Sequence, residues 1–210
     1  MKTYWITCIC ILLLIPVYSQ GSFTDFQGGF LFPSNAKTGF IGGIQVGRMV
    51  DDAIGYGIEL DIYRKKYVED RRISLGSQGG AEVDSLIREV DNTVIMLPLL
   101  FKLNYSHALN KKLMLGLSGG IGYEVLWNSV NKPSEGIDDT KFYHGFAWMI
   151  GGKVAMPLSK ASNIFLEIDY HNSEPSRKED ETPEGADIRK SINMSGFILR
   201  LGIRIFTIGL

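Results

Sequence analysis

The stretch that decides the fold is residues 55–67, GYGIELDIYRKKY. Its side chains alternate strictly between two faces. One face reads Tyr56, Ile58, Leu60 and Ile62, and the other reads Gly57, Glu59, Asp61 and Tyr63. Alternation with period two indicates a β-strand with one apolar face and one charged face. Either the apolar face packs on a protein core, or it faces lipid while the carboxylates face the inside of a barrel.

The same alternation recurs along the chain, separated by connections of two kinds. Further strands are predicted at residues 22–32, 39–50, 93–105, 113–127, 142–156, 164–171 and 197–205. Tight turns are predicted near residues 51, 108 and 160, and polar loops at residues 68–92, 128–141 and 172–190. An even number of strands with short turns at one end and longer loops at the other is typical of outer-membrane barrels. We therefore predict an all-β fold, an eight-stranded antiparallel up-and-down transmembrane β-barrel.

The composition fits one domain of this class. The 210 residues carry a formal net charge of −1 and 21% charged residues, so there is no electrostatic argument for a nucleic-acid partner. Glycine occurs 24 times. This excess argues against a helical protein, because an interior glycine costs a helix about 1 kcal/mol relative to alanine.

The first residues have the features of a signal peptide. Lys2 precedes an apolar run at residues 4–17, which is shorter than the ~20 residues that a spanning helix needs. Val17 and Ser19 occupy the −3 and −1 positions of a cleavage site after Ser19. We predict a signal peptide at residues 1–19 and a barrel domain at residues 20–210.

Metal and thiol chemistry is not expected in the mature chain. Both cysteines, Cys8 and Cys10, lie in the predicted signal peptide, so the mature chain would have no disulfide and no thiolate metal site. His107, His144 and His171 are scattered and lack metal-ligand spacing. We predict no cofactor and no metal.

The size of the side chains distinguishes the inside of the barrel from the outside. On each strand the side chains of one phase are large and apolar, and those of the other phase belong to glycine, alanine, serine and charged residues. A soluble barrel would need bulky apolar residues inside, whereas small and charged residues fit the narrow lumen of eight strands. The alternative is that the charged phase is a solvated face. We predict an interior polar network of nine residues: Glu59, Asp61, Lys102, Glu124, Lys153, Glu167, Asp169, Arg200 and Arg204. Asp25 takes the same phase.

Two segments carry a resemblance to a known family. They are GFIGGIQVGRMVDDAIGYGIELDIYRKKY at residues 39–67 and VIMLPLLFKLNY at residues 94–105. The chain resembles the outer-membrane β-barrel domain family, especially PorT-like barrels of Bacteroides-type bacteria, and the OmpA transmembrane domain in architecture. The resemblance implies the outer membrane of a Gram-negative bacterium and a barrel assembly machinery as partner. Members usually end in an aromatic residue, whereas Phe206 here is not terminal.

The sequence leaves the role open between different classes. The first is a non-enzymatic barrel that serves the envelope structurally or presents external loops to a ligand or protein partner. Outer-membrane lipid and lipopolysaccharide would surround it. The second is a narrow channel for small solutes or a secretion accessory. The third is a lipid-modifying enzyme, because His171-Asn172-Ser173 is loosely similar to the His-x-Ser of lipid A deacylase barrels. We expect a non-enzymatic protein.

Overall fold

The computed structural model describes residues 21–34, 36–78, 81–132, 137–178 and 189–207, and it describes the side chains of these except at residues 68–78, 81–91, 132, 137 and 138. The predicted signal peptide and its cleavage site lie outside the described residues. The strands are β1 (Gly21–Pro33), β2 (Gly39–Met49), β3 (Ile54–Gln78), β4 (Ala81–Asn110), β5 (Leu113–Lys132), β6 (Ile137–Ser159), β7 (Ser162–Ser173), β8 (Ser176–Lys178), β9 (Arg189–Ser191) and β10 (Gly196–Thr207).

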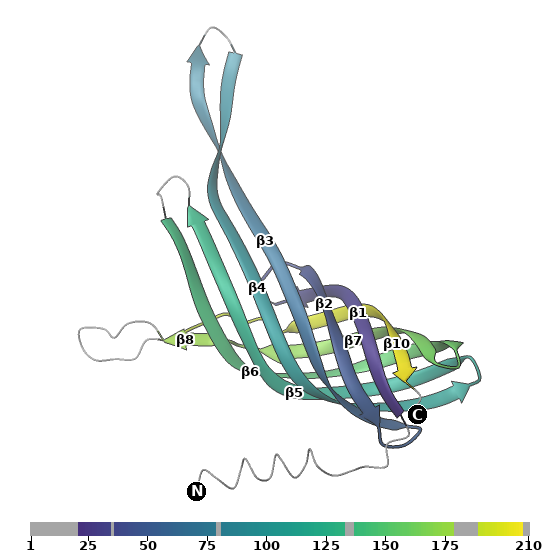
Figure 1. Cartoon of the computed structure of the whole chain (residues 1–210). Helices are drawn as coiled ribbons and strands as arrows, with labels where there is room; N and C mark the ends of the chain where they lie inside the picture. Colours follow the sequence, from purple (N-terminus) through teal and green to yellow (C-terminus); the bar gives the residue numbers. More distant parts are fainter. Residues whose placement is uncertain (1–20, 35, 79–80, 133–136, 179–188, 208–210) are drawn as a thin grey trace, which may run out of the picture.

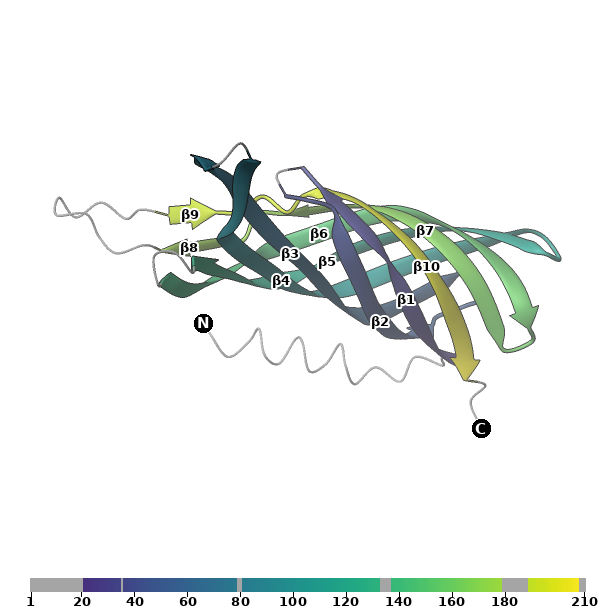
Figure 2. The same ribbon diagram turned by 90° about the horizontal axis from the view of Figure 1, so that it is seen from above.

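Eight of these strands close into a barrel (Figures 1 and 2). The order around the wall is β5-β4-β3-β2-β1-β10-β7-β6, and a pairing between β5 and β6 completes the circle. Every pair is antiparallel, including the pair of the first and last strands, β1 and β10. The predicted eight-stranded antiparallel barrel is therefore confirmed. Among the described residues, no helix is long and apolar enough to cross a membrane.

The two ends of the barrel differ in their connections. At one end β1 begins, β10 ends, and β4 and β5 are joined by the two residues Lys111 and Lys112. We call this the turn end. At the other end β3 and β4 continue together far beyond the wall (Figure 1), and we call it the loop end. The predicted asymmetry between short turns and long connections is thus present.

The structure corrects the prediction of a polar loop at residues 68–92, because the described part of this range lies in β3 and β4. β3 and β4 run as one paired hairpin up to Gln78 and Ala81, with irregularities between Glu69 and Asp70 and again before Ser77. The sequence of residues 68–92 lacks the period-two apolar alternation that identified the other strands. The backbone N–H and C=O groups still need partners there, and antiparallel pairing supplies them.

The other two predicted loops are also partly strand. β5 and β6 pair through the range predicted as a loop at residues 128–141, as far as Lys132 and Ile137. Within residues 172–190, the short strands β8 and β9 pair with each other. β8 joins the barrel through His144 and Ser176.

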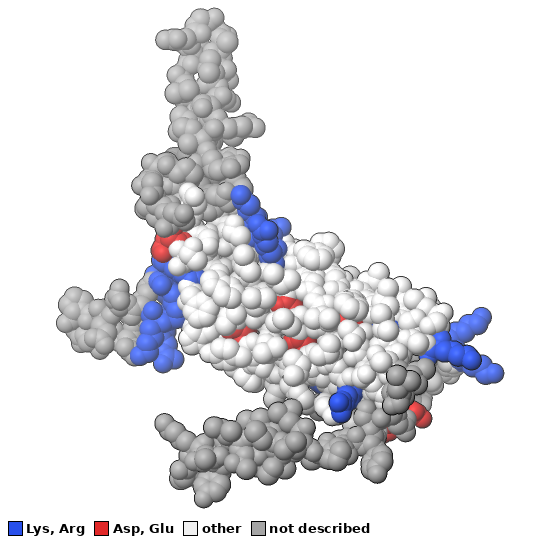
Figure 3. All heavy atoms as spheres, viewed as in Figure 1, with Lys and Arg blue, Asp and Glu red and all other residues white. Residues whose placement is uncertain are grey.

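The outer wall of the barrel is apolar. On β3, Leu60 is 46% exposed while its neighbour Glu59 is fully buried. Leu117 on β5 is 65% exposed, and the buried Ser118 follows it. The predicted phase therefore holds on these strands, with the large apolar side chains outside. Figure 3 shows a mostly uncharged wall with lysine and arginine gathered towards its two ends.

Aromatic side chains meet in pairs on the outer wall towards the loop end. The rings of Tyr170 and Phe197 lie 5.3 Å apart, and those of Trp127 and Phe142 lie 5.6 Å apart. Aromatic girdles at this position are typical of barrels that cross a membrane, because the rings suit the interface between lipid and water.

The interior contains more large apolar side chains than the sequence analysis assigned to it. A continuous cluster of them, which we call the apolar layer, fills the lumen towards the loop end. It consists of Leu31, Ile41, Tyr63, Val94, Met96, Leu126, Tyr143, Met194 and Ile198. Eight strands leave room for side chains only, so a section of lumen without charges is closed by apolar packing.

Candidate functional site

Arg200 of β10 is the centre of the polar interior. Its Nη1 lies 3.0 Å from Glu59 Oε1 and 2.9 Å from Asp61 Oδ2. Its Nη2 donates a short hydrogen bond to Asp169 Oδ2 and lies 3.7 Å from Glu167 Oε2. The guanidinium is fully buried. One arginine therefore binds carboxylates from β3 and β7 at once, as its fork of N–H donors allows.

Lys102 of β4 joins the same carboxylates from another side. Its Nζ lies 3.0 Å from Glu59 Oε2 and 3.2 Å from Glu167 Oε1. Ser118 Oγ lies within hydrogen-bond reach of Glu167 Oε1 at 3.0 Å and Asp169 Oδ1 at 3.2 Å. Glu167 of β7 thus bonds across the lumen to side chains of β4 and β5, and its charge is shared between several donors.

Glycines on adjacent strands make this geometry possible. Gly43 of β2 pairs with Asp61, and Gly151 of β6 pairs with Asp169. A Cβ at either glycine would collide with the Oδ1 atom of its paired aspartate. The frequent inward glycine of the sequence therefore creates the space into which the two carboxylates on either side of Arg200 turn.

A second layer of charges lies closer to the turn end. Arg204 of β10 binds Asp25 of β1 in a bidentate manner, with Nε to Oδ1 and Nη2 to Oδ2 both at 2.7 Å. Lys153 of β6 lies 3.6 Å from Asp25 Oδ2 and 3.5 Å from Glu167 Oε2. Lys153 is the link between this layer and the cluster around Arg200.

Glu124 of β5 is separate from these charges. It accepts a hydrogen bond from Ser173 Oγ at 2.7 Å, and His171 Nε2 lies 2.9 Å from its other oxygen. All three side chains are buried in the lumen. The Ser173 hydroxyl is bonded to the carboxylate and not to the imidazole, which differs from the base and nucleophile pair that His-x-Ser suggested.

Of the nine residues predicted for the interior network, the structure places eight in one connected set and Glu124 in a second. The connected residues are Glu59, Asp61, Lys102, Lys153, Glu167, Asp169, Arg200 and Arg204. The predicted set omitted five polar participants, namely Asp25, Gln27, Ser118, His171 and Ser173. Each shares the inward phase of its strand, so the alternation itself was the signal that could have found them.

The interior is therefore closed at two successive levels. The buried carboxylates of Asp25, Glu59, Asp61, Glu167 and Asp169 pair with the cations Lys102, Lys153, Arg200 and Arg204, and Glu124 contacts His171 and Ser173 instead. Beyond them, towards the loop end, lies the apolar layer. Each of these buried charges requires an opposite charge beside it, because an unpaired buried charge costs several kcal/mol. The arrangement suits a plug.

Comparisons with known proteins show the fold. The structure is similar to that of Ail, the attachment invasion locus protein of Yersinia pestis, in complex with the heparin analogue sucrose octasulfate. The TM-score is 0.50 at 12% sequence identity, over 89% of this chain and 97% of that chain. It is also similar to the outer membrane protein OprG of Pseudomonas aeruginosa, with a TM-score of 0.51 at 12% identity over 91% and 98% of the two chains.

A further likeness is to the N-terminal β-barrel domain of Pseudomonas aeruginosa OprF, with a TM-score of 0.51 at 10% identity over 90% of this chain and 99% of that chain. No protein-family model matches the chain, and no curated protein matches it in sequence. These comparisons do not confirm the resemblance to PorT-like barrels. They show that the chain has the fold of eight-stranded outer-membrane β-barrels.

Proposed function

We propose that this chain is an integral barrel of the outer membrane of a Gram-negative bacterium. The apolar outer wall and the charged interior support this location, because only a lipid surrounding favours that distribution. In the proposed orientation the turn end lies in the periplasm and the loop end lies outside the cell. The resemblance of residues 39–67 and 94–105 to PorT-like barrels is part of the proposal.

The role that we propose is non-enzymatic. The barrel serves the envelope structurally, or it presents its external hairpins to a ligand or protein partner. The observation that carries this proposal is the combination of a lumen filled at two levels with a hairpin that continues beyond the wall. The eleven residues of β3 beyond Tyr67 span roughly 36 Å at about 3.3 Å per residue. A filled lumen favours a barrel that presents its external hairpins over a barrel that conducts solutes.

The rim of the loop end supports contact with anionic surroundings. Arg64 and Lys66 on β3 lie there, as do Lys178 on β8 and Lys190 on β9. Phosphate groups of lipopolysaccharide lie at this depth of the membrane in the proposed orientation, and Lys and Arg attract them. The sulfated sugar bound by Ail makes an anionic polysaccharide a reasonable external ligand to test.

Surface labelling of whole cells tests the proposal. An epitope inserted between Gln78 and Ala81, at the tip of the β3–β4 hairpin, should be labelled by antibody on intact cells. The matched control is the same epitope between Lys111 and Lys112 at the turn end, which should be labelled only after the outer membrane is opened. Labelling of the second site alone on intact cells would reverse the orientation, and labelling of neither in the membrane fraction would contradict a spanning barrel.

A shortened hairpin tests the presenting role itself. Deletion of residues 70–89 removes the distal part of β3 and β4 and keeps the paired residues of the wall. We expect the variant to keep heat-modifiable mobility in gels, because the barrel folds without the extension. Surface binding of a partner, or of sucrose octasulfate as a probe, should fall. A barrel that no longer forms would show that the extension is structural.

A further inference from the structure

The connected charges inside the barrel do not balance. Among the described residues, five carboxylates face four cations: Asp25, Glu59, Asp61, Glu167 and Asp169 against Lys102, Lys153, Arg200 and Arg204. The five carboxylates are at most 2% exposed. A surplus negative charge away from water is strongly unfavourable, so the folded set requires one more positive charge.

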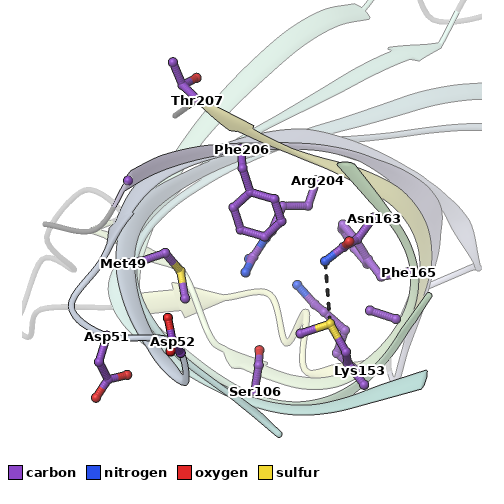
Figure 4. Close-up of a pocket in the computed structure, with 13 residues that line it drawn as sticks. Met49, Asp51, Asp52, Ser106, Lys153, Asn163, Phe165, Arg204, Phe206 and Thr207 are labelled. Atoms are coloured by element: carbon purple, nitrogen blue, oxygen red, sulfur yellow. Dashed lines mark hydrogen bonds between the residues drawn. The ribbon is translucent and has the colours of Figure 1, made fainter. Parts of the chain in front are cut away.

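Solvent reaches only the margin of this set. A cavity of about 220 Å³ opens at the turn end, with the exposed turn at Asp51 and Asp52 at its mouth (Figure 4). Lys153 and Arg204 are among the described residues that line it, whereas Asp169 is not. On the other side, towards the loop end, lies the apolar layer. The surplus charge at the centre of the set is therefore not relieved by contact with bulk water.

Ser118 lies between two of the carboxylates and can satisfy only one of them. Its Oγ is 3.0 Å from Glu167 Oε1 and 3.2 Å from Asp169 Oδ1. A hydroxyl has one hydrogen to donate and two lone pairs that accept, and an ionised carboxylate accepts only. If both carboxyls were ionised, one of them would face a lone pair of the hydroxyl. A proton on one carboxyl removes this conflict, because that carboxyl then donates to Ser118.

The two carboxyls differ in the cations around them. Glu167 has three within 4 Å, with Lys102, Lys153 and Arg200 at 3.2, 3.5 and 3.7 Å. Asp169 has Arg200 as its one ion-pair partner among the described residues, and that guanidinium also binds both carboxylates of β3. Glu167 is therefore better stabilised as an anion, and Asp169 is the carboxyl that gains more from a proton.

The surroundings of Asp169 are negative even when its own charge is left out. The charged groups that face it are Arg200 on β10, Lys102 on β4, Glu59 and Asp61 on β3, and Glu167 on its own strand β7. These are two cations and three carboxylates. The neighbouring position on β6 is Gly151, which has no side chain. His171, also on β7, has its ring bonded to Glu124.

We propose that Asp169 is protonated in the folded barrel and that its proton is the fifth positive charge of the plug. The Oδ1–H group donates to Ser118 Oγ, Ser118 donates to Glu167 Oε1, and Asp169 Oδ2 accepts from Arg200. The chain takes up this proton from solvent when it folds, which leaves four ionised carboxylates against four cations. Loss of the proton at high pH restores the surplus charge, so the plug is sensitive to pH. The inference does not depend on the proposed presentation of hairpins.

Infrared spectroscopy of the full chain, refolded in lipid vesicles, tests the protonation directly. At neutral pH the wild type should show the carbonyl band of a protonated carboxylic acid. Asp169→Asn should lack this band, because the amide has the same shape and donates to Ser118 without a titrating proton. Glu124→Gln changes another buried carboxyl of the lumen and should keep the band. Absence of the band from the wild type, or its loss in Glu124→Gln alone, would overturn the proposal.

The pH dependence of stability is a second measurement on the same variants. An unfolded aspartate releases its proton at about pH 4, whereas the folded barrel retains it at neutral pH. Folding thus takes up one proton, so raising the pH should destabilise the wild type relative to Asp169→Asn. The unfolding equilibrium constant should change by up to about tenfold per pH unit. Glu124→Gln should follow the wild type. Parallel curves for the wild type and Asp169→Asn would contradict the proton.

Two further experiments cover other outcomes. If Asp169→Asn does not fold, Ser118→Ala replaces it, and the acid band should persist at a shifted frequency because its hydrogen-bond acceptor is gone. A band that Ser118→Ala leaves unchanged would place the proton elsewhere and overturn the proposal. Replacing sodium by choline in the buffer should not change the stability of the wild type. A sodium-dependent stability without an acid band would mean that a metal cation supplies the missing charge.

Discussion

Arg200 and Glu59 stand 141 positions apart in the sequence and form an ion pair of 3.0 Å in which neither side chain is exposed. They come from β10 and β3, which are separated by β1 and β2 around the wall. Their pairing therefore crosses the lumen instead of following the sheet. The pair therefore depends on the closed barrel.

Arg200→Ala should lower the free energy of unfolding by about 3–5 kcal/mol, because it leaves buried carboxylates without their cation. Urea unfolding in lipid vesicles measures this. Adding Asp61→Asn to the variant should recover part of the loss, since one unpaired charge disappears. Arg48→Ala on the exposed face of β2 is the control, with an expected change within about 0.5 kcal/mol. An equal effect of the two single substitutions would mean that the lumen is wet.

Leu117→Arg should destabilise the barrel by about 2–4 kcal/mol, because the new charge lies in the hydrocarbon part of the bilayer. Leu109 is 53% exposed close to the turn end of β4, so Leu109→Arg should cost only about 0–1 kcal/mol. Unfolding of both variants in the same vesicles gives the comparison. A Leu117→Arg barrel as stable as the original protein would contradict the lipid-facing phase.

Leu126→Ala should cost about 2–5 kcal/mol, because Leu126 is fully buried in the apolar layer and its loss leaves a cavity. Leu158→Ala is the matched control, since Leu158 is 61% exposed at the turn end. The difference between the two midpoints of unfolding is the observable. No difference would mean that the apolar layer does not pack in the membrane.

The sequence predicted the wall of the barrel because its signal is local. Leu60 and Glu59 differ in environment by one position, and period-two alternation reports that difference directly. The charged inward residues were recognisable for the same reason. Their grouping into two sets was not recognisable, because Glu124 and Glu167 both point inward but lie at different levels of the lumen. The level of each residue depends on the register of all eight strands.

Two further features could not be read from local patterns. The apolar layer brings together Met96 of β4 and Ile198 of β10, and only closure of the wall makes them neighbours. The strands beyond Tyr67 pair without apolar alternation in their sequence, so the sequence analysis predicted a loop where the structure has a hairpin.

Intact-mass measurement of the exported protein checks the prediction for residues 1–19. The mature chain should begin at Gln20, and it should not react with a thiol reagent because Cys8 and Cys10 are removed. A thiol-reactive mature protein would contradict the predicted cleavage after Ser19.

Planar-bilayer recording of the purified barrel tests the central claim most directly. The ion pairs around Arg200 and the apolar layer that includes Leu126 close the lumen at two levels. We therefore predict no steady conductance from the wild type, even when insertion is verified by heat-modifiable mobility of the same sample. Steady currents of the size that porins carry would contradict the plug and favour a channel.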